Sequence, residues 1–337
     1  MNNVTLGLIG VGRIGVMHAR NIVALGHTLK LTDVAAEHAQ RVAADLGAEY
    51  LPSVDALLAS GIDALVIATG TALHPEHIRA GVDAGIPVFC EKPVAVNVAE
   101  SLPVLEYIRE HDGVVQIGHQ RRFDAGYLEA KRAYDAGEVG WIHSLRATTC
   151  DMTPPPVEFL AGSGGLFRDC SVHDFDILRW LTGREIVEVY ARGSNNGDPA
   201  IGAIGDVDTA LAMVTFDNGM LGTVSASRYN GGGHDVRLEL QGSTATLLVG
   251  LDDNSALISA EPGVSAPAGT PHRTFAERFD QAYRSEMAAF VQLVRGEREN
   301  PCTPDDAVAA SRVADAAQQS LDTGQPVRVA GTLALAT

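Results

Sequence analysis

The chain is poor in cysteine and in positive charge, and each shortage excludes a class of protein. Its 337 residues contain four cysteines, none in a C-x-x-C pair, so a disulfide scaffold is not expected. Lysine and arginine number 25 against 42 acidic residues, a net charge of −17. Nucleic acids and anionic membranes both attract basic surfaces. We therefore expect neither nucleic acid nor membrane as a partner.

Long apolar runs are also missing. No stretch approaches the roughly 18 apolar residues that a membrane-spanning helix requires. No secretory signal peptide is recognisable before the strand-like run that begins at Val4, so a cytoplasmic protein is expected. Apolar residues nevertheless make up 46% of the chain and charged residues 20%. This composition is typical of a folded protein with a sizeable core.

Two patterns of secondary structure follow one another along the chain. Up to residue 120, short apolar runs such as Val4–Ile9 and Thr28–Thr32 alternate with amphipathic stretches, which favours a parallel sheet with helices on both faces. Later runs such as 209–216 and 222–227 follow one another directly, joined by the hairpin signal Asp217-Asn218-Gly219. We therefore expect a second domain with an antiparallel sheet.

A glycine-rich turn follows the first predicted strand and opens a helix. It reads Gly10-Val11-Gly12-Arg13-Ile14-Gly15, in the strand–turn–helix context that a dinucleotide site requires. Asp33 ends the second predicted strand, where a carboxylate accepts hydrogen bonds from ribose hydroxyls and repels a 2′-phosphate. The pattern predicts a bound NAD in preference to NADP. The alternative is a glycine-rich turn in an unrelated α/β protein.

Glu91-Lys92-Pro93 follows the fifth predicted strand. Ligands of a doubly wound sheet lie beyond the carboxyl ends of its strands, so Lys92 is expected beside the nicotinamide. From position alone, a solvated surface lysine is an equally good interpretation.

Asp169 and His173 stand four residues apart. If a helix begins near Asp169, the two side chains share one face. An imidazole suits proton transfer near neutral pH, and a carboxylate fixes its tautomer and stabilises its cation. Taken alone, an N-terminal helix cap and a structural histidine explain the pair better.

Metal ligation is the remaining chemical possibility. His74, His77 and the His173-Asp174 pair offer donor atoms, but none has the spacing of a known zinc site. We expect no catalytic metal.

These motifs together resemble the glucose–fructose oxidoreductase and inositol dehydrogenase family (Gfo/Idh/MocA), with inositol 2-dehydrogenases the most similar. The more specific resemblance lies in Pro154–Leu160 and Ser163–Asp169. It implies an N-terminal Rossmann domain, residues 1–120, and a C-terminal α/β domain, residues 121–337, with a large open antiparallel sheet. That sheet commonly forms a subunit interface, so a homodimer or homotetramer is expected.

The resemblance also implies an NAD-dependent dehydrogenase that acts on CH–OH groups of a cyclic polyol or sugar. It assigns catalysis to Lys92, Asp169 and His173. The implied cofactor contacts are Gly10, Gly12, Arg13, Ile14, Gly15, Asp33, Thr69, His74 and Glu91. The implied substrate contacts are Arg121 or Arg122, and Asp151.

Several positions depart from the inositol dehydrogenase pattern. Cys150 and Met152 flank Asp151 where arginine and proline are expected, His119 replaces an apolar residue, and His234 replaces a tyrosine. These changes fall on the substrate side. They leave open a dehydrogenase or reductase of a non-inositol sugar. A non-catalytic NAD-binding sensor is a further alternative, although it would not need Lys92 and the Asp169–His173 pair.

Overall fold

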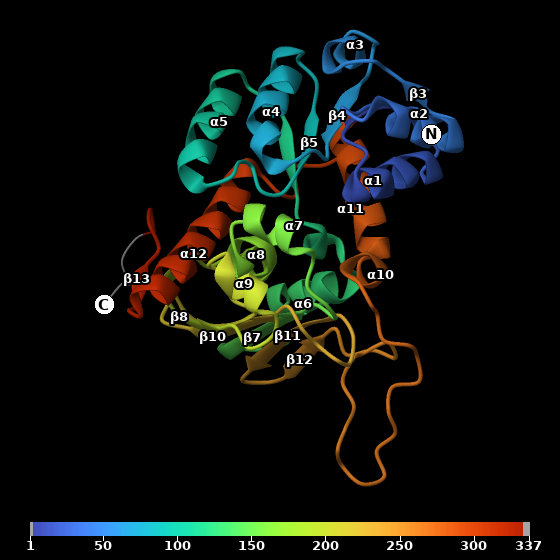
Figure 1. Ribbon diagram of the computed structural model, residues 1–337. Coiled ribbons are helices and arrows are strands. Elements are labelled where there is room, and N and C mark those ends of the chain that lie inside the picture. Colours follow the sequence, from blue (N-terminus) through green and yellow to red (C-terminus); the bar gives the residue numbers. More distant parts are fainter. Residues whose placement is uncertain (1–2, 333–337) are drawn as a thin grey trace. The chain divides into compact units, whose positions relative to one another are not determined.

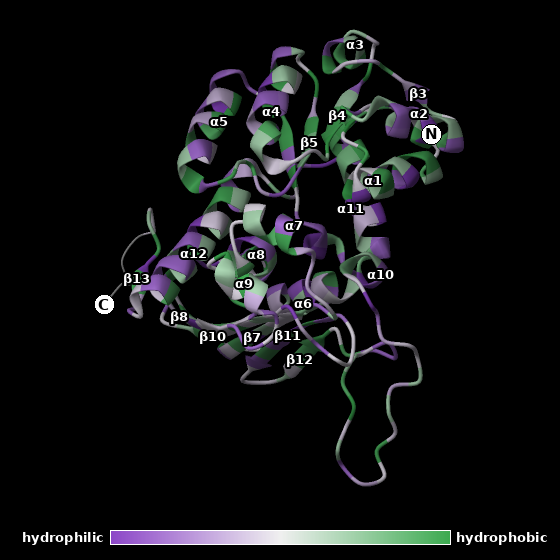
Figure 2. Ribbon diagram, viewed as in Figure 1, coloured by the Kyte–Doolittle hydropathy of each residue, from purple (hydrophilic) through white to green (hydrophobic). Residues whose placement is uncertain are grey.

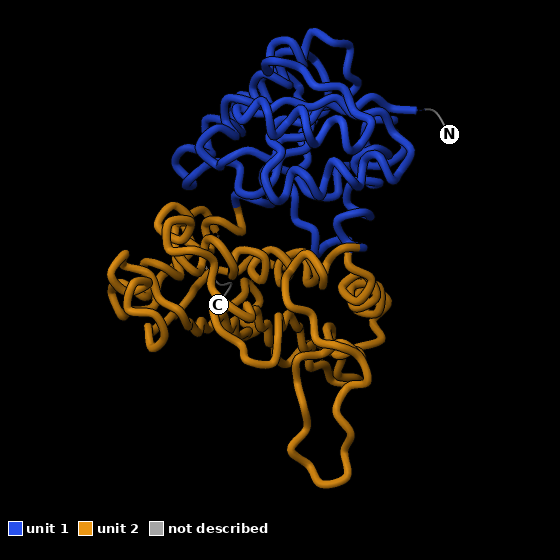
Figure 3. Tube along the Cα trace, turned by 45° about the vertical axis from the view of Figure 1, so that its right-hand side comes forward, with its two compact units in different colours: residues 1–123, 281–308 blue, residues 124–280, 309–337 orange. Residues whose placement is uncertain are grey.

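The computed structural model describes residues 3–332. The chain divides into two compact units, here called the first and the second unit (Figure 3). The first comprises Met1–Phe123 and Gln281–Val308, and the second comprises Asp124–Asp280 and Ala309–Thr337. The predicted N-terminal domain includes residues 1–2 and the predicted C-terminal domain includes residues 333–337. Both of these short segments lie outside the described residues. A late segment, 281–308, thus joins the N-terminal residues in one unit.

The first unit contains a six-stranded sheet in which every neighbouring pair is parallel. The strand order is β3-β2-β1-β4-β5-β6, which confirms the predicted Rossmann fold. Its strands are β1 (Thr5–Ile9), β2 (Thr28–Thr32), β3 (Glu49–Tyr50), β4 (Ala64–Ile67), β5 (Val88–Glu91) and β6 (Val115–Gly118). Its helices are α1 (Arg13–Ala24), α2 (Ala36–Leu46), α3 (Val54–Leu58), α4 (His74–Asp83) and α5 (Val98–Glu110), and most of α11 (Asp280–Val294) also belongs to it.

Both faces of this sheet are covered, and the central strand β4 is apolar and buried at every position. In β4, Leu65 and Ile67 belong to one core cluster with residues of α4 and α5. Ala64 and Val66 point the other way, into a cluster with residues of α1, α2 and α11. Figure 1 shows α4 and α5 on one side and α1 and α2 on the other, and Figure 2 shows the apolar colour of the strands between them.

The second unit contains a seven-stranded sheet in the order β12-β11-β7-β10-β9-β8-β13. Its strands are β7 (Ile142–Cys150), β8 (Ile186–Ser194), β9 (Thr209–Phe216), β10 (Leu221–Ser227), β11 (Asp235–Gly242), β12 (Thr246–Val249) and β13 (Val327–Arg328). The predicted antiparallel pairing holds for all neighbours except β7 and β10, which run parallel. That exception brings the carboxyl ends of β7 and β10 to the same edge of the sheet.

This second sheet is covered on one face only. Along β9, the side chains of Ala210, Ala212, Val214 and Phe216 are buried, whereas those between them are exposed or half-buried. Such alternation is typical of an antiparallel sheet with one open face. The helices of this unit are α6 (Ala125–Asp135), α7 (Val157–Gly162), α8 (Val172–Thr182), α9 (Pro199–Ala203), α10 (Phe275–Arg278) and the larger part of α12 (Pro304–Thr323).

Local signals explain where several elements begin. Ser53 caps α3 and Asn97 caps α5 through their side-chain oxygens, as expected of N-cap residues. The helical pattern of residues 275–294 forms two helices, α10 and α11, which are separated at Phe279, where the backbone leaves helical geometry with φ −113° and ψ 17°. Within the described residues, no helix combines the length and hydropathy that a bilayer crossing requires.

Candidate functional site

The glycine-rich turn joins β1 to α1. Gly10 has a positive φ of 91°, and a Cβ atom there would lie 2.6 Å from the Ala68 carbonyl oxygen. A Cβ atom on Gly15 would come within 2.0 Å of the Gly10 carbonyl oxygen. Side chains at either position would push the turn apart, so both glycines are required by the backbone itself.

Gly12 is different, because the space beside it is open. A Cβ atom there would meet no atom within 4 Å, and its φ of −66° suits any residue. Gly12 is also the N-cap of α1, which receives no side-chain cap. The N–H groups at this helix N-terminus are uncapped, and a ligand can approach the backbone closely. Both features suit the pyrophosphate of a dinucleotide. Arg13 and Ile14 form the first turn of that helix, and the turn fits NAD.

Asp33 directly follows β2 and braces the same turn. Its Oδ2 accepts a hydrogen bond of 2.7 Å from the Val11 backbone N–H, and its Oδ1 accepts one of 2.8 Å from Ala35. The side chain of the next residue, Val34, is 99% exposed. The carboxylate is therefore fixed by the backbone of the glycine turn, with no neighbouring cation in sequence to attract a 2′-phosphate.

His74 ties two loops at the carboxyl ends of β4 and β5. Its Nδ1 lies 2.7 Å from the Pro93 carbonyl oxygen, and its Nε2 lies 3.2 Å from that of Thr69. Burial lowers the pKa of His74 below its ordinary value, although both carbonyls favour the charged ring. The structure thus brings Thr69 and His74 together, as the resemblance implies, and connects both to the segment that carries Lys92.

Glu91 is the last residue of β5, and Lys92 follows it at the strand's carboxyl end. The Glu91 Oε1 atom lies 2.6 Å from Nε2 of His18, whose side chain is fully buried on α1. Sequence reasoning missed His18. Its only signal was its place one turn after Gly15 on the helix that follows the glycine turn.

Tyr283 on α11 is a second residue beside Glu91 that was not assigned to the site from the sequence. Its ring packs edge-on against His18, with 5.9 Å between ring centroids. Burial raises the pKa of the Tyr283 hydroxyl well above its ordinary value, and the charges of Glu91 and Glu286 add to that effect. The hydroxyl therefore stays protonated beside the Glu91 carboxylate. Nothing in the local sequence places residue 283 next to residue 91.

Arg121 and Arg122 lie in a short 3-10 helix, η2 (Gln120–Phe123), just after β6. Both side chains are buried. The Arg122 guanidinium donates a hydrogen bond of 2.9 Å to the Pro301 carbonyl oxygen and lies 3.4 Å from Asp306. These contacts hold the late segment of the first unit, which gives Arg122 a structural role that the sequence did not indicate.

In the second unit, the predicted residue Asp151 lies at one edge of the sheet with two residues that were not assigned to the site, Arg228 and His234. Asp151 follows β7, Arg228 follows β10, and His234 precedes β11. Because β7 and β10 are parallel and β11 is antiparallel to β7, all three residues lie at the same edge. Asp151 Oδ1 lies 3.3 Å from Nδ1 of His234.

The chemistry at that edge is further defined by Cys150 and by His234. Burial, followed by the charges of Asp235 and Asp174, raises the pKa of Cys150 to about 12, so its thiol is protonated near neutral pH. The His234 side chain is almost fully buried, and its Nε2 atom has no hydrogen-bond partner among the described residues. Both residues stand where the inositol dehydrogenase pattern expects another side chain.

Asp169 is displayed on an unusual turn. Gly164 and Gly165 both adopt positive φ angles of 83° and 91°. They lead into η3 (Phe167–Ser171), which is a π-helical turn rather than the start of an α-helix. His173 follows, half-buried, in the first turn of α8. π-turns are frequent at functional sites, and this one accounts for the Ser-Gly-Gly stretch that precedes Asp169.

Arg228 is the partner of Asp169 that sequence reasoning missed. Its side chain is fully buried, and its Nη1 donates a hydrogen bond of 2.6 Å to Asp169 Oδ2. Nη2 lies 3.4 Å from Asp206 Oδ2. Burial works to lower the pKa of Arg228, but Cys170, Asp169 and Asp206 outweigh it and leave the pKa above its ordinary value. The guanidinium is therefore permanently charged.

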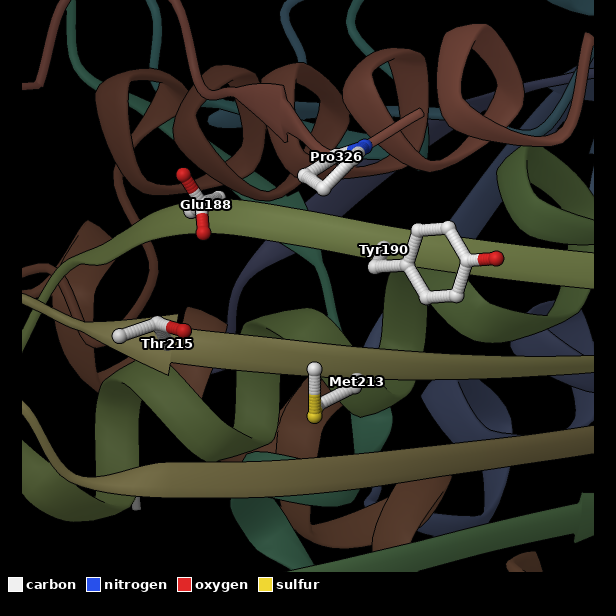
Figure 4. A pocket seen from close by; sticks show the side chains of 5 residues that line it. All are labelled: Glu188, Tyr190, Met213, Thr215 and Pro326. Carbon is white, nitrogen blue, oxygen red and sulfur yellow. The ribbon is translucent and has the colours of Figure 1, made fainter. Parts of the chain in front are cut away.

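A pocket of about 190 Å³ lies elsewhere, on the open face of the second sheet (Figure 4). It is lined by Glu188, Tyr190, Met213, Thr215 and Pro326. None of these belongs to the predicted site, and the pocket therefore carries no argument about catalysis.

Comparison with known proteins accounts for both halves of this arrangement. The pattern that defines the Gfo/Idh/MocA "Oxidoreductase family, NAD-binding Rossmann fold" matches residues 4–119. The pattern for the "Oxidoreductase family, C-terminal alpha/beta domain" matches residues 131–329. The chain belongs to this family. It is therefore an oxidoreductase with an NAD-binding Rossmann domain.

Among the relatives are several inositol dehydrogenases that match over nearly the whole chain. Myo-inositol dehydrogenase Hyg17 of Streptomyces leeuwenhoekii is 38% identical, covering 95% of this chain and 98% of its own. The scyllo-inositol 2-dehydrogenase (NAD(+)) of Bacillus subtilis is 36% identical, covering 97% of each. A crystal structure of scyllo-inositol dehydrogenase from Lactobacillus casei with bound NAD(H) and scyllo-inositol superposes with a TM-score of 0.88. It is 29% identical and covers 98% of this chain and 100% of that one.

Proposed function

We propose that this oxidoreductase is an NAD-dependent dehydrogenase of a CH–OH group in an inositol-like cyclic polyol. The observation that carries the proposal is the ion pair between Asp169 and the buried Arg228. The pair fixes the ionised carboxylate of Asp169 four residues before the half-buried imidazole of His173. A histidine that acts as a general base needs such a carboxylate. Full-length similarity to inositol dehydrogenases supports the substrate class.

The roles of the catalytic residues follow from their chemistry. His173 takes the proton of the substrate hydroxyl at a ring nitrogen, and Asp169 stabilises the resulting imidazolium. Lys92 donates a hydrogen bond from Nζ to the reacting oxygen and stabilises the negative charge that develops there. Bound NAD supplies the hydride acceptor. Reduction of a keto-sugar uses the same residues with the proton moving the other way.

The cofactor preference rests on the glycine turn and on Asp33. Gly10, Gly12, Arg13, Ile14 and Gly15 would hold the pyrophosphate, with Thr69, His74 and Glu91 on the nicotinamide side. The Asp33 carboxylate, anchored by Val11 N–H, would accept hydrogen bonds from the ribose hydroxyls and repel a 2′-phosphate. We therefore propose NAD rather than NADP.

One observation favours a second candidate, a sugar other than inositol. Arg121 or Arg122 and Asp151 are the proposed substrate contacts, and Asp151 is paired with His234 at 3.3 Å. An imidazole in place of a tyrosine removes a phenol hydroxyl and places a ring nitrogen beside Asp151 instead. That exchange alters the hydrogen-bond pattern that distinguishes one polyhydroxylated ring from another.

The test is a panel of inositol isomers and monosaccharides, with NAD and NADP in parallel, scored by the absorbance of the reduced cofactor. We expect the largest kcat/KM for an inositol with NAD. A monosaccharide in first place would replace inositol by the second candidate, and the variant His234→Tyr should then move preference back toward inositols. No turnover across the panel would contradict the proposed activity.

We also propose a homodimer or homotetramer formed through the open face of the second sheet. Leu211, Met213 and Leu221 expose 60%, 48% and 47% of their surfaces on that face, and Met213 also lines the pocket of Figure 4. Adjacent exposed apolar side chains on a sheet are typical of a protein interface. Sedimentation of the wild type and of Met213→Glu would test it, with dissociation expected in the variant.

A further inference from the structure

We infer that Arg228 is a positioning residue for Asp169, with Asp206 as its second anchor. This inference rests on the proposed function, because Asp169 matters to catalysis only if it acts on His173. Neither Arg228 nor Asp206 belongs to a motif that pointed to the site. Their roles follow from contacts within the second unit.

The first step of the argument is the cost of burying Arg228. A guanidinium with 0% exposure needs close counter-charges, since an unpaired buried charge is strongly unfavourable. Two carboxylates supply them: Asp169 at 2.6 Å and Asp206 at 3.4 Å. Arg228 thus lies between two acids, and its planar fork of donors restricts where each carboxylate can be.

The second step is that Asp206 is fixed independently. Its Oδ1 accepts hydrogen bonds from the backbone N–H of Leu166 at 3.0 Å and of Val207 at 2.8 Å. Leu166 directly precedes the π-turn that carries Asp169. Asp206 therefore holds the start of that turn through Leu166 and the guanidinium through Oδ2. The two contacts converge on Asp169.

The third step is that the Asp169 backbone does not settle its side chain. The turn is π-helical and is entered through Gly164 and Gly165, both with positive φ. Tilting of this turn would move the Asp169 carboxylate, and a misplacement of about 1 Å can cost about 10²-fold in rate. Arg228 opposes such tilting, because it comes from the end of β10 and its backbone N–H bonds the Asp208 carbonyl oxygen at 2.7 Å.

The test compares Arg228→Met, Arg228→Lys and Asp206→Asn with wild type, using full-length enzyme and the best substrate of the panel. A matched control is Arg179→Met, which removes another largely buried arginine with a carboxylate partner, Glu185 at 2.6 Å. We expect Arg228→Met to lower kcat about 10- to 100-fold. Arg228→Lys should recover part of that loss, Asp206→Asn should show a smaller one, and Arg179→Met should keep wild-type kcat.

A readout that a purely structural role would not move is the primary isotope effect with substrate deuterated at the reacting carbon. Loss of positioning slows the chemical step, so the isotope effect on kcat should rise in Arg228→Met, while NADH affinity measured by fluorescence titration stays unchanged. Loss of folded enzyme would lower the number of NADH sites and leave the isotope effect unaltered.

The inference is overturned if Arg228→Met keeps wild-type kcat, or if its kcat per NADH site and its isotope effect match those of Arg179→Met. Should Arg228→Met fail to fold, Arg228→Lys and Asp206→Asn decide the matter, and wild-type kcat in both would overturn it. Failure of the proposed function has a different signature, because the wild type itself would then not oxidise inositols. The variant series would in that case be run with whichever panel substrate is turned over.

Discussion

The two units hold their candidate site residues by different means. In the first unit, the glycine turn, Asp33 and Lys92 are placed by strand ends and by backbone hydrogen bonds, such as that from Val11 N–H to Asp33. In the second unit, Asp169 is placed by a buried side chain, Arg228, which lies 59 residues further along the chain. Backbone placement depends on local sequence, whereas side-chain placement depends on how distant strands pair.

The partners also differ in their charge. Glu91 faces His18 at 2.6 Å, and the Thr69 and Pro93 loops meet at His74. His74 is an imidazole whose pKa is lowered by burial, and its charge changes with pH. Asp169 faces an arginine, which does not. The contacts of His74 in the first unit should therefore respond to pH, whereas the pair of Asp169 and Arg228 in the second unit should not.

The largest expected effect sharpens this comparison by removing one proposed catalytic residue from each unit. Lys92→Met and His173→Ala should each lower kcat by about 10²–10⁴-fold, because a positioned donor and a general base typically contribute that much. NADH affinity, measured by fluorescence titration, should survive in His173→Ala. Steady-state kinetics with the best panel substrate provide the measurement.

Lys131→Met and His143→Ala are the matched controls, since both side chains lie outside the proposed site on α6 and β7. Wild-type turnover in His173→Ala would remove the second unit from the chemistry. Near-normal activity in Lys92→Met would return Lys92 to a solvated surface role.

A smaller effect is expected at the ribose end of the first unit. In the double variant Asp33→Ser with Val34→Arg, the carboxylate that repels a 2′-phosphate is lost and a cation is gained at a fully exposed position. We expect the kcat/KM ratio of NADP to NAD to rise about ten-fold or more, since about 1.4 kcal/mol of relative affinity corresponds to ten-fold.

Val34→Arg alone is the control and should shift the ratio less, because Asp33 still repels the phosphate. An unchanged ratio in the double variant would mean that Asp33 only braces the glycine turn and does not read the ribose. Local sequence would then have predicted the wrong role for Asp33 in the first unit.

The same contrast explains how much could be predicted from the sequence. The parallel sheet of the first unit, the strand bounds of β2 and β9 and the hairpin at Gly219 follow from local periodicity and turn chemistry, and the structure agrees with them. The parallel pairing of β7 with β10 has no local signal, because parallel and antiparallel strands share one pattern of alternation. Arg228 and Asp206 were missed for that reason.

Two further features escaped prediction for related reasons. Tyr283 reaches the first unit from a segment that periodicity assigns to the C-terminal half, and only the fold places it beside His18. The π-turn at Asp169 looks like an ordinary helix start in sequence, because one additional residue in a turn leaves the apolar pattern of α8 intact.

The smallest expected effect concerns pH and the imidazoles of the first unit. Burial lowers the folded-state pKa of His74 below its ordinary value of 6.5, so below that pH the unfolded chain binds a proton that the folded chain resists. Stability rises with pH where the unfolded state binds more protons. The contribution of neutral His74 is therefore present above about pH 6.5 and lost as the pH falls below it.

We expect the urea midpoint of unfolding to fall between about pH 8 and about pH 5.5, and to fall less in His74→Asn. His77 and His272 shift in the same direction, so the dependence should weaken rather than vanish. His143→Asn, a change at an exposed ring on β7, serves as the control and should leave the slope as in the wild type. If the urea midpoint of His74→Asn depended on pH as strongly as that of the wild type, the imidazole that joins the Thr69 and Pro93 loops would contribute nothing measurable to the pH response, like Arg228 in the second unit.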